Sequence, residues 1–379
     1  LELNFNSNKE ANIPIKALAE KAPIYDRKWR KIKLPKLKTN TSIVKDKNLE
    51  DSFVKLISSQ NFSSKKWVYE QYDQMVMNNT IRKSGGDASI IKINDEKAIA
   101  LTVDSSANYC KAHPISGGKQ IICENWRNLI SVGSKPIAIT NCLNFGNPEE
   151  TEVMGQFAEI IQGMKEACEY LNFPVVSGNV SFYNGTNKKN IYPTPVIGGV
   201  GLITNLKELT SHNFKNENNT IILIGKTFGH LDQSCYLKEN YSIQEGKPPE
   251  INLLNEKNNG ETVLNLIQSN LVSAAHDVSN GGLIVALCEM AMGSKFGVKI
   301  SKSKALRNLA QYFFGEDQGR YVLEIDQKKL NSVEKILKMN NIYFEKIGFT
   351  QKKYFEIEGE MKVDTNDLFK INNQWYNNY

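Results

Sequence analysis

Two apolar runs separated by a polar stretch constrain the fold of this chain more than any other feature. The runs Pro195–Ile203 and Thr220–Gly225 both have the composition of buried strands. Between them, Lys207–Asn219 is polar, Asn-rich and without a strong period, which is typical of a segment on the surface. With 379 residues, the chain is longer than one hydrophobic core usually supports. We therefore predict two domains that meet near residue 207.

Hydrophobic periodicity predicts mixed helices and strands in both units. In the first unit we expect strands at Ala98–Val103 and Pro136–Asn141 and helices at Gly118–Val132 and Gly155–Tyr170. In the second we expect helices at Gly260–Asn270 and Gly281–Met292 and strands at Gly319–Ile325 and Tyr343–Phe349. The predicted parts are a connector and N-terminal extension (1–63), an α/β domain (64–206), an α+β domain (207–358) and a C-terminal tail (359–379).

Composition excludes several classes of protein. The charge of +6, from 47 Lys and Arg against 41 Asp and Glu, is too diffuse for a nucleic-acid surface. No run approaches the roughly 18 apolar residues of a membrane span, so we expect no membrane partner. Six widely spaced cysteines without a C-x-x-C pair indicate buried free thiols in a reducing compartment, the cytoplasm. The start at Leu1 leads us to expect a piece of a longer protein with an artificial N-terminus.

Two Asn- and Gly-rich segments follow predicted strands of the first unit. In Thr140–Pro148 the carboxamides can bind a polar ligand or cap backbone groups, and residue types alone favour capping. In Val175–Asn184, Gly178 permits close approach of a phosphate, and Asn179 offers an oxygen suited to Mg²⁺. Ordinary turns use the same residues. Because Asn179 and Ser181 are two apart in an extended segment, we expect both side chains on one side.

The second unit has two further polar segments. In His276–Gly282, Asp277 or Ser279 can cap the helix, and its glycines can expose N–H groups to an anion. For His276 itself, a packed histidine bonded to backbone is favoured over a general base. Gly315–Arg320 can bind a metal–phosphate or close a turn with an ion pair. The chain has neither a P-loop nor a dinucleotide fingerprint.

Eight segments together resemble phosphoribosylformylglycinamidine synthase of purine biosynthesis. Four of them are TNCLNFGNPEE (140–150), SGNVSFYN (177–184), HDVSNGGL (276–283) and FGEDQGRY (314–321). The others are IPIKALAEKAPIYDR (13–27), WVYEQYDQMV (67–76), GGDASII (85–91) and GGKQ…WRNLISVG (117–133). The resemblance runs in order through almost the whole chain.

The resemblance implies a fold and a reaction. The family's synthase has two homologous halves, each an α/β domain followed by an α+β domain like aminoimidazole ribotide synthetase, and this chain resembles the second half. The family amidates formylglycinamide ribonucleotide: ATP phosphorylates the amide oxygen in the presence of Mg²⁺, and ammonia then displaces phosphate. By resemblance, Asn141 and Gly178 contact ATP, Asn179 contacts Mg²⁺ and Ser181 contacts the substrate. The family's catalytic histidines belong to the first half, so we expect no catalytic residue here.

The sequence departs from the family pattern at two places. Many members have Asp where this chain has Asn141, which leaves an amide to hydrogen-bond the nucleotide. Leu231–Cys235 replaces a Leu-Gly-Gly-Ser-Glu turn, and we interpret Cys235 as a packing substitution.

The resemblance also implies partners and leaves alternatives. The expected partners are the missing first half, a separate glutaminase subunit and a small bridging subunit. One alternative is a non-catalytic scaffolding half that holds a structural nucleotide, and another is a stand-alone enzyme like aminoimidazole ribotide synthetase.

Overall fold

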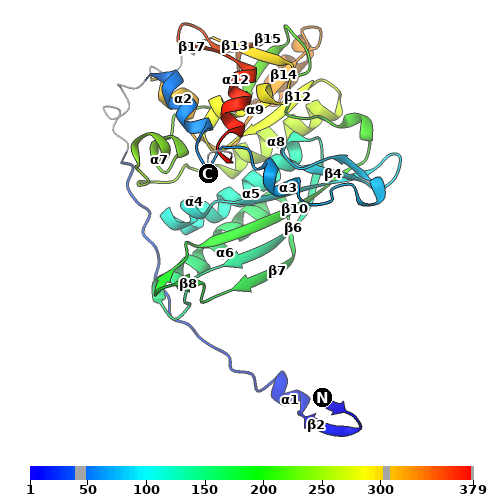
Figure 1. Ribbon diagram of the computed structural model, residues 1–379, viewed down its shortest axis with the longest axis vertical. Coiled ribbons are helices and arrows are strands. Elements are labelled where there is room, and N and C mark those ends of the chain that lie inside the picture. Colours follow the sequence, from blue (N-terminus) through cyan, green and yellow to red (C-terminus); the bar gives the residue numbers. More distant parts are fainter. Residues whose placement is uncertain (39–47, 302–307, 377–379) are drawn as a thin grey trace.

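The computed structural model describes residues 1–38, 48–301 and 308–376, and its first large sheet has six strands (Figure 1). Their order is β3-β4-β5-β10-β6-β7. The strands are β3 (Thr80–Arg82), β4 (Ser89–Lys92), β5 (Ala98–Ser105), β6 (Lys135–Asn144), β7 (Val175–Ser181) and β10 (Thr194–Ile203). All neighbours are antiparallel except β6 and β7, which run parallel and are joined through a helix.

One face of this sheet is covered by α5 (Pro114–Ser131) and α6 (Thr151–Leu171), which pack closely on each other. The burial of β10 alternates strictly, with Ile197 and Ile203 buried and their neighbours half-exposed. This period of two is what a strand with one covered face requires. Helix α5 begins with Pro114 in its first turn, and the ring of His113 accepts a hydrogen bond from the Ser116 amide.

The second large sheet has seven strands in the order β12-β14-β11-β15-β13-β16-β17. They are β11 (Thr220–Ile224), β12 (Ala274–Val278), β13 (Phe296–Ile300), β14 (Arg320–Ile325), β15 (Phe344–Lys352), β16 (Tyr354–Ile357) and β17 (Met361–Asp364). Every residue of β11 and β14 is buried, because helices pack on both faces of the sheet. On one face lie α8 (Leu253–Gln268) and α11 (Leu330–Met339), and on the other α2 (Leu49–Ile57), α7 (Cys235–Tyr241), α9 (Gly282–Met292), α10 (Leu309–Phe314) and α12 (Thr365–Asn373).

The remaining described elements are short. They are β1 (Glu2–Phe5), β2 (Asn8–Asn12), α1 (Ile15–Leu18), α3 (Lys66–Tyr69), η1 (Val76–Asn78), α4 (Ala107–Ala112), β8 (Gly185–Thr186), β9 (Lys189–Asn190) and η2 (Leu206–Glu208). The first three form an arm that extends away from the body (Figure 1). Among the described residues, no helix is both long and apolar enough to cross a membrane.

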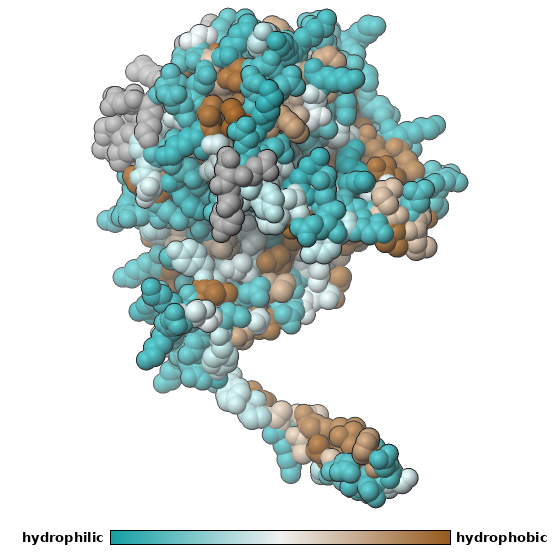
Figure 2. All heavy atoms as spheres, viewed as in Figure 1, coloured by the Kyte–Doolittle hydropathy of each residue, from teal (hydrophilic) through white to brown (hydrophobic). Residues whose placement is uncertain are grey.

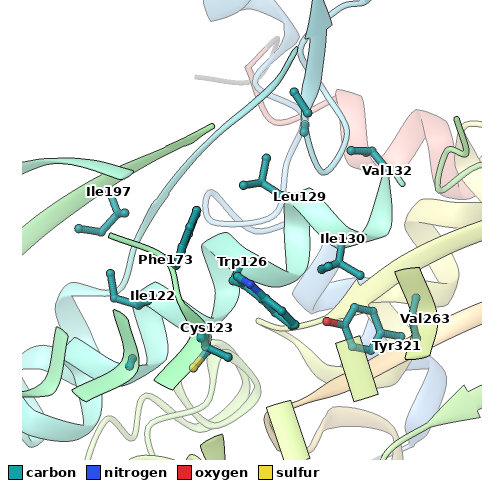
Figure 3. Close-up of a cluster of buried hydrophobic side chains, with 14 of the residues drawn as sticks. Ile122, Cys123, Trp126, Leu129, Ile130, Val132, Phe173, Ile197, Val263 and Tyr321 are labelled. Atoms are coloured by element: carbon teal, nitrogen blue, oxygen red, sulfur yellow. The ribbon is translucent and has the colours of Figure 1, made fainter. Parts of the chain in front are cut away.

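One hydrophobic cluster joins the two units. Helix α5 packs against α8, so the helices of both sheets share a core that contains Trp126, Val263 and Tyr321 (Figure 3). The closest approach is at Gly260 of α8, where a Cβ atom would lie 2.0 Å from the ring of Trp126. The two units are therefore held together by packed side chains and not only by a linker.

The predicted elements are present in the structure, with shifted ends. Helix α8 starts at Leu253, seven residues before the predicted Gly260, because Asn252 accepts a hydrogen bond from the Asn255 amide and caps the helix earlier. The second sheet continues past residue 358, since β17 pairs with β16. The four domain limits stay predictions, and 39–47 of the expected connector and 377–379 of the tail lie outside the described residues.

We predict that Gly260→Ala destabilises the protein. Replacing glycine inside a helix gains about 1 kcal/mol of helix propensity. Overpacking against the buried Trp126 ring costs about 1–3 kcal/mol, so we expect a net loss of unfolding free energy. Urea denaturation measures it, with the exposed Asn258→Ala of the same helix as the control that stays neutral or gains slightly. Equal or greater stability of Gly260→Ala would show that α5 and α8 are not tightly packed.

Candidate functional sites

The parallel strands β6 and β7 bring the four expected site residues to one edge of the first sheet. Asn141 of β6 pairs with Gly178 of β7. Further along the same two strands, Cys142 pairs with Asn179 and Asn144 pairs with Ser181. Gly178 and Asn179 are exposed, whereas Asn141 and Ser181 are half-buried. The two segments thus lie side by side at the carboxyl ends of adjacent strands, where ligands often bind in α/β sheets.

The pleat of the sheet divides these four residues between its two faces. Ile139 and Leu143, which lie two residues before and two residues after Asn141, are both buried under the helices. Side chains two apart on a strand share a face, so Asn141 lies on the helix-covered face as well. A Cβ at Gly178 would lie 2.2 Å from Asn141 Oδ1, so Gly178 presents the same face and leaves room for that amide. Asn179 and Ser181 lie together on the opposite, open face.

Most of the other Asn side chains in these segments cap backbone groups. Asn144 Nδ2 donates to Thr194 O at 3.2 Å, and Asn147 Oδ1 accepts from the Glu149 amide at 3.0 Å. Asn184 Nδ2 donates to the carbonyls of Phe145 and Ser181 and to Ser181 Oγ, each at 3.0 Å. The structural interpretation of these segments is therefore correct for Asn144, Asn147 and Asn184. Within the described residues, Asn141 and Asn179 have no such role.

Exposed apolar side chains lie on the open face and along the edge strand β7. Val103 is 70% exposed and Val176 71% exposed, and five more large apolar residues nearby in the sheet and its loops are also exposed: Ile137, Val175, Val180, Tyr183 and Tyr192. Apolar patches of this kind mark surfaces that bind another protein or a ligand.

A second candidate site is a cavity of about 660 Å³ between the two units. The first unit contributes Asp87, before β4, together with Asp104, at the end of β5, and Glu124, on α5. The second unit contributes His276 and Asp277 from β12. With Glu289 of α9, five carboxylates from separate segments of the chain therefore face one cavity.

Hydrogen bonds orient these carboxylates. Asp104 accepts from Asn125 Nδ2 at 2.7 Å and from Asn128 Nδ2 at 2.8 Å. The Arg127 guanidinium donates from Nε to Asp277 Oδ2 at 3.2 Å. Asp87 Oδ2 is buried and lacks a hydrogen-bond partner among the described residues. The carboxylates are thus rigidly held, and the cavity has more negative than positive groups.

Burial and this excess of negative charge together raise the pKa values of three of the carboxyl groups. Burial raises the pKa of Glu124 to about 7, and the neighbouring Asp277 carboxylate adds to the rise. Burial and the Glu124 charge hold the pKa of Asp104 well above its ordinary value. Burial also raises the pKa of Asp277, although Arg127 opposes it. A divalent cation, which prefers carboxylate and amide oxygens, would compensate these charges. Asp87 and Asp277 offer carboxylate oxygens within 4.8 Å of each other, whereas carboxylates engage both ring nitrogens of His276.

His276 is a packed histidine, but its partners are carboxylates and not the expected backbone groups. Its Nδ1 lies 2.5 Å from Asp87 Oδ1, and its Nε2 lies 3.0 Å from Glu289 Oε2. Burial lowers the pKa of His276, but the charges and hydrogen bonds of these two carboxylates outweigh burial and raise it well above its ordinary value. Because carboxylates engage both ring nitrogens, the geometry favours a packed histidine over a general base.

The helix start after Val278 differs from the expected anion site. Neither Asp277 nor Ser279 caps α9, because the chain enters the helix through Gly281 and Gly282 at positive φ, a path without a side-chain cap. The Gly281 amide donates instead to Glu316 Oε1 at 2.8 Å. The chain's own carboxylate therefore occupies the place that we expected for a phosphate.

The Gly315–Arg320 segment closes a turn, although not by the expected ion pair. Asp317 accepts hydrogen bonds from the amides of residues 228–230. Arg320 donates to the carbonyls of Gly315 and Asp317 and to Thr227 Oγ1. Burial and the Glu316 charge raise the pKa of the Cys235 thiol well above its ordinary value, which agrees with a packing role for Cys235.

Sequence reasoning assigned no role to Asp87, Asp104 or Glu124 and considered Asp277 only as a helix cap. Glu124 and Asn128 are four apart on α5 and share one face, a pattern that could have drawn attention to this helix. Asp104 follows a predicted strand directly. Only the packing of the two units shows that these residues converge, because Asp87 and Asp277 are nearly two hundred positions apart.

Comparison with known proteins defines the class of this chain. Residues 85–203 match the N-terminal domain of AIR synthase related proteins, and residues 216–358 match the C-terminal domain of the same family. The fold is thus that of an AIR synthase related protein, with an α/β domain followed by an α+β domain, as the sequence predicted.

Within this class, the chain belongs to the phosphoribosylformylglycinamidine synthase subunit PurL family. It is 51% identical over 381 aligned positions to that subunit of Pelagibacter ubique, covering 100% of this chain and 52% of the relative. The chain therefore spans about half the length of this curated relative.

Solved structures share the fold. Thermotoga maritima PurL complexed with FGAR has a TM-score of 0.69 at 14% identity, over 86% of this chain and 54% of that protein. The same protein complexed with ATP has a TM-score of 0.59 at 20% identity, over 93% and 48%.

We predict that the protein loses stability as the pH rises from about 4.5 to about 7. The folded state retains the Glu124 proton up to the higher value, whereas the unfolded chain releases it near its ordinary pKa of 4.5. Folding therefore binds protons in this interval, and the free energy of unfolding falls with pH. His276, whose pKa is also raised, acts in the same direction at higher pH. Urea denaturation at pH 5, 6, 7 and 8 measures the effect.

Glu124→Gln removes one titrating group and should flatten this dependence. The exposed Glu261→Gln on α8 is the matched control and should retain the slope of the parent. A Glu124→Gln variant with the full slope of the parent would mean that the folded state does not raise the pKa of Glu124.

Proposed function

We propose that this chain is the second half of a phosphoribosylformylglycinamidine synthase, which amidates formylglycinamide ribonucleotide with ATP and ammonia in the cytoplasm. The observation that carries the proposal is the parallel pairing of β6 with β7, which aligns Asn141, Gly178, Asn179 and Ser181 at one sheet edge. The family membership and the FGAR and ATP complexes of the Thermotoga maritima protein support it.

In this proposal each residue has one task. The Asn141 amide hydrogen-bonds the nucleotide, and Gly178 has no side chain that would keep a phosphate from the strand. Asn179 offers its amide oxygen to Mg²⁺, which would neutralise phosphate charge during phosphoryl transfer. Ser181, held by Asn184, hydrogen-bonds the substrate. Because β7 is the edge strand, a ligand can reach both of its faces.

The surroundings of this edge support a site that another polypeptide segment completes. Asn179 is exposed, and Val103, an apolar side chain on the same face, is exposed as well. A phosphoryl-transfer site needs water to be excluded, which this surface alone does not achieve. We propose that the other half of the synthase covers it and contributes the acid–base groups. A glutaminase subunit and a small bridging subunit would supply ammonia, and the 379-residue chain alone would be inactive.

We predict that Asn179→Ala and Ser181→Ala affect different kinetic constants in the complex of this chain with its complementary half. Removing a ligand of a charged species costs about 1.5–3 kcal/mol, so Asn179→Ala should raise KM for Mg·ATP roughly 10- to 100-fold. Ser181→Ala loses a neutral hydrogen bond worth about 0.5–1.5 kcal/mol and should raise KM for formylglycinamide ribonucleotide roughly 3- to 10-fold.

Ammonium-dependent ADP release measures both effects. Ser177→Ala is the matched control, since Ser177 is exposed on the same open face of β7 and pairs with Thr140. Unchanged constants in both test variants would assign the edge a structural role only.

The cavity between the units supports a second function, the binding of a structural Mg²⁺–nucleotide. The observation that favours it is the set of buried or half-buried carboxylates with raised pKa values, Asp104, Glu124 and Asp277, beside the unpaired oxygen of Asp87. A Mg²⁺ ion held by these oxygens would lower the pKa values and would carry the phosphates of the nucleotide. The cavity volume of about 660 Å³ suits a ligand of that size.

We predict that Mg²⁺ with ADP stabilises the chain against heat. Binding at about one hundred times Kd adds about 2.7 kcal/mol to the free energy of unfolding. Thermal shift and calorimetry at pH 7.5, with ADP and Mg²⁺ together and each alone, measure it. The Asp104→Asn/Glu124→Gln double variant should lose the shift, while Glu261→Gln should keep it. An equal shift in the double variant would place the nucleotide elsewhere.

A further inference from the structure

The arm formed by β1, β2 and α1 has an apolar side without a partner. Leu3, Phe5, Ile15 and Leu18 are all exposed, Phe5 by 68% and Ile15 by 71%. In Figure 2 hydrophobic side chains gather on one side of the arm and hydrophilic ones on the other. The arm first bonds to the body at Arg27, which contacts Tyr183 and Glu149. A two-stranded hairpin is only marginally stable by itself, so covering this apolar side with a partner would stabilise the arm.

The hairpin of the arm repeats the hairpin β16–β17 at the other end of the chain. Both are antiparallel, and both turn through residues in the left-handed region. Leu3 and Phe5 are two apart on β1, as Phe355 and Ile357 are on β16. Leu3 pairs with an apolar residue, Ala11, as Phe355 pairs with Val363.

The repeat continues into the helix that follows each hairpin. Ile15 and Leu18 of α1 are three apart, as Leu368 and Ile371 are in α12. The spacing from Leu3 to Ile15 is one residue shorter than the spacing from Phe355 to Leu368. Strand, turn, strand and helix thus recur in the same order with apolar residues at matching positions.

The two copies differ in burial. Phe355, Ile357 and Leu368 are fully buried in the core of the second sheet, where β16 pairs in parallel with β13. Their counterparts Leu3, Phe5 and Ile15 are exposed, and within the described residues β1 pairs only with β2. The copy in the arm therefore has the sequence of a sheet-completing hairpin without a sheet to complete.

We propose that the hairpin and helix of residues 2–18 dock onto a second α+β domain of the AIR synthase related type, with β1 pairing in parallel to the strand of that domain that corresponds to β13. The apolar side of β1 and α1 would enter the core of that domain, as β16 and α12 do here. The free edge of β1 supplies the backbone donors and acceptors for such an added strand.

Two observations identify the partner as the other half of the synthase and not a second copy of this chain. The β13 strand of this chain already has β15 and β16 on its two edges, so a second copy offers no vacant place. The Pelagibacter ubique relative is about twice as long as the matched region, which leaves room for a further domain pair. The inference rests on the proposed function in this respect only.

The test is complex formation between the 379-residue chain and the part of the Pelagibacter ubique subunit that this chain does not match. Leu3→Asp/Phe5→Asp places two charges on the apolar side of the hairpin. Asn4→Asp/Asn12→Asp is the matched control, because it places two charges on the opposite side. Calorimetry gives Kd, and hydrogen exchange reports protection of the β1 amides.

We expect the Leu3→Asp/Phe5→Asp variant to weaken the complex at least tenfold and the control to change Kd less than about twofold. The β1 amides of the parent chain should become protected only in the complex. Equal affinity in both variants, β1 amides that exchange freely in the complex, no complex with the parent chain, or self-association through the arm would each overturn the proposal. The proposed function is tested separately by ADP release that depends on formylglycinamide ribonucleotide. If the complex is active and its Kd is the same with the arm variants as with the parent chain, only the role of the arm is refuted.

Discussion

The guanidinium of Arg127 is the interaction on which the relation of the two units depends. Arg127 lies on α5 of the first unit and is fully buried. It donates to Glu256 Oε1 at 2.9 Å, to Asp277 Oδ2 at 3.2 Å and to Gln318 Oε1 at 3.1 Å, all in the second unit. Removing one partner of a buried ion pair costs about 3–5 kcal/mol, because it leaves charges without compensation. Separating the two units would therefore expose these charged groups to water or leave them buried without a partner.

This junction also explains where the cavity lies. Arg127 pairs with two carboxylates, but Asp104 and Glu124 are left with neutral amide partners. The excess negative charge is thus confined to one side of α5, where the end of β5 meets β12. The packing of apolar residues such as Trp126 and Tyr321 behind it prevents the carboxylates from moving apart. Acidic groups held in place along an open cavity are suited to a cation and its anionic ligand.

The open face of the first sheet and the apolar side of the arm share one physical property. Both carry apolar strand residues without a cover, because Val103, Leu3 and Phe5 are exposed. Apolar side chains on a strand cost no solvation free energy when a partner covers them, whereas exposed apolar side chains favour association with a partner. In the two proposals above, one further domain pair would cover both surfaces.

The sequence by itself determined the local structure and the family. The alternating burial of β10, the helices α5, α6 and α9, and the segments around Asn141 and Gly178 follow from period, turn chemistry and residue type, which act over a few neighbouring residues. Only the tertiary structure decided which residues meet. Asp87, Asp104, Glu124 and Asp277 come from four segments, and the pKa values of Asp104, Glu124 and Asp277 rise because folding removes water from them and brings like charges together. For the same reason the partners of His276, and the filling of the α9 start by Glu316, could not be predicted from local pattern, because contacts between distant segments depend on how the two sheets pack.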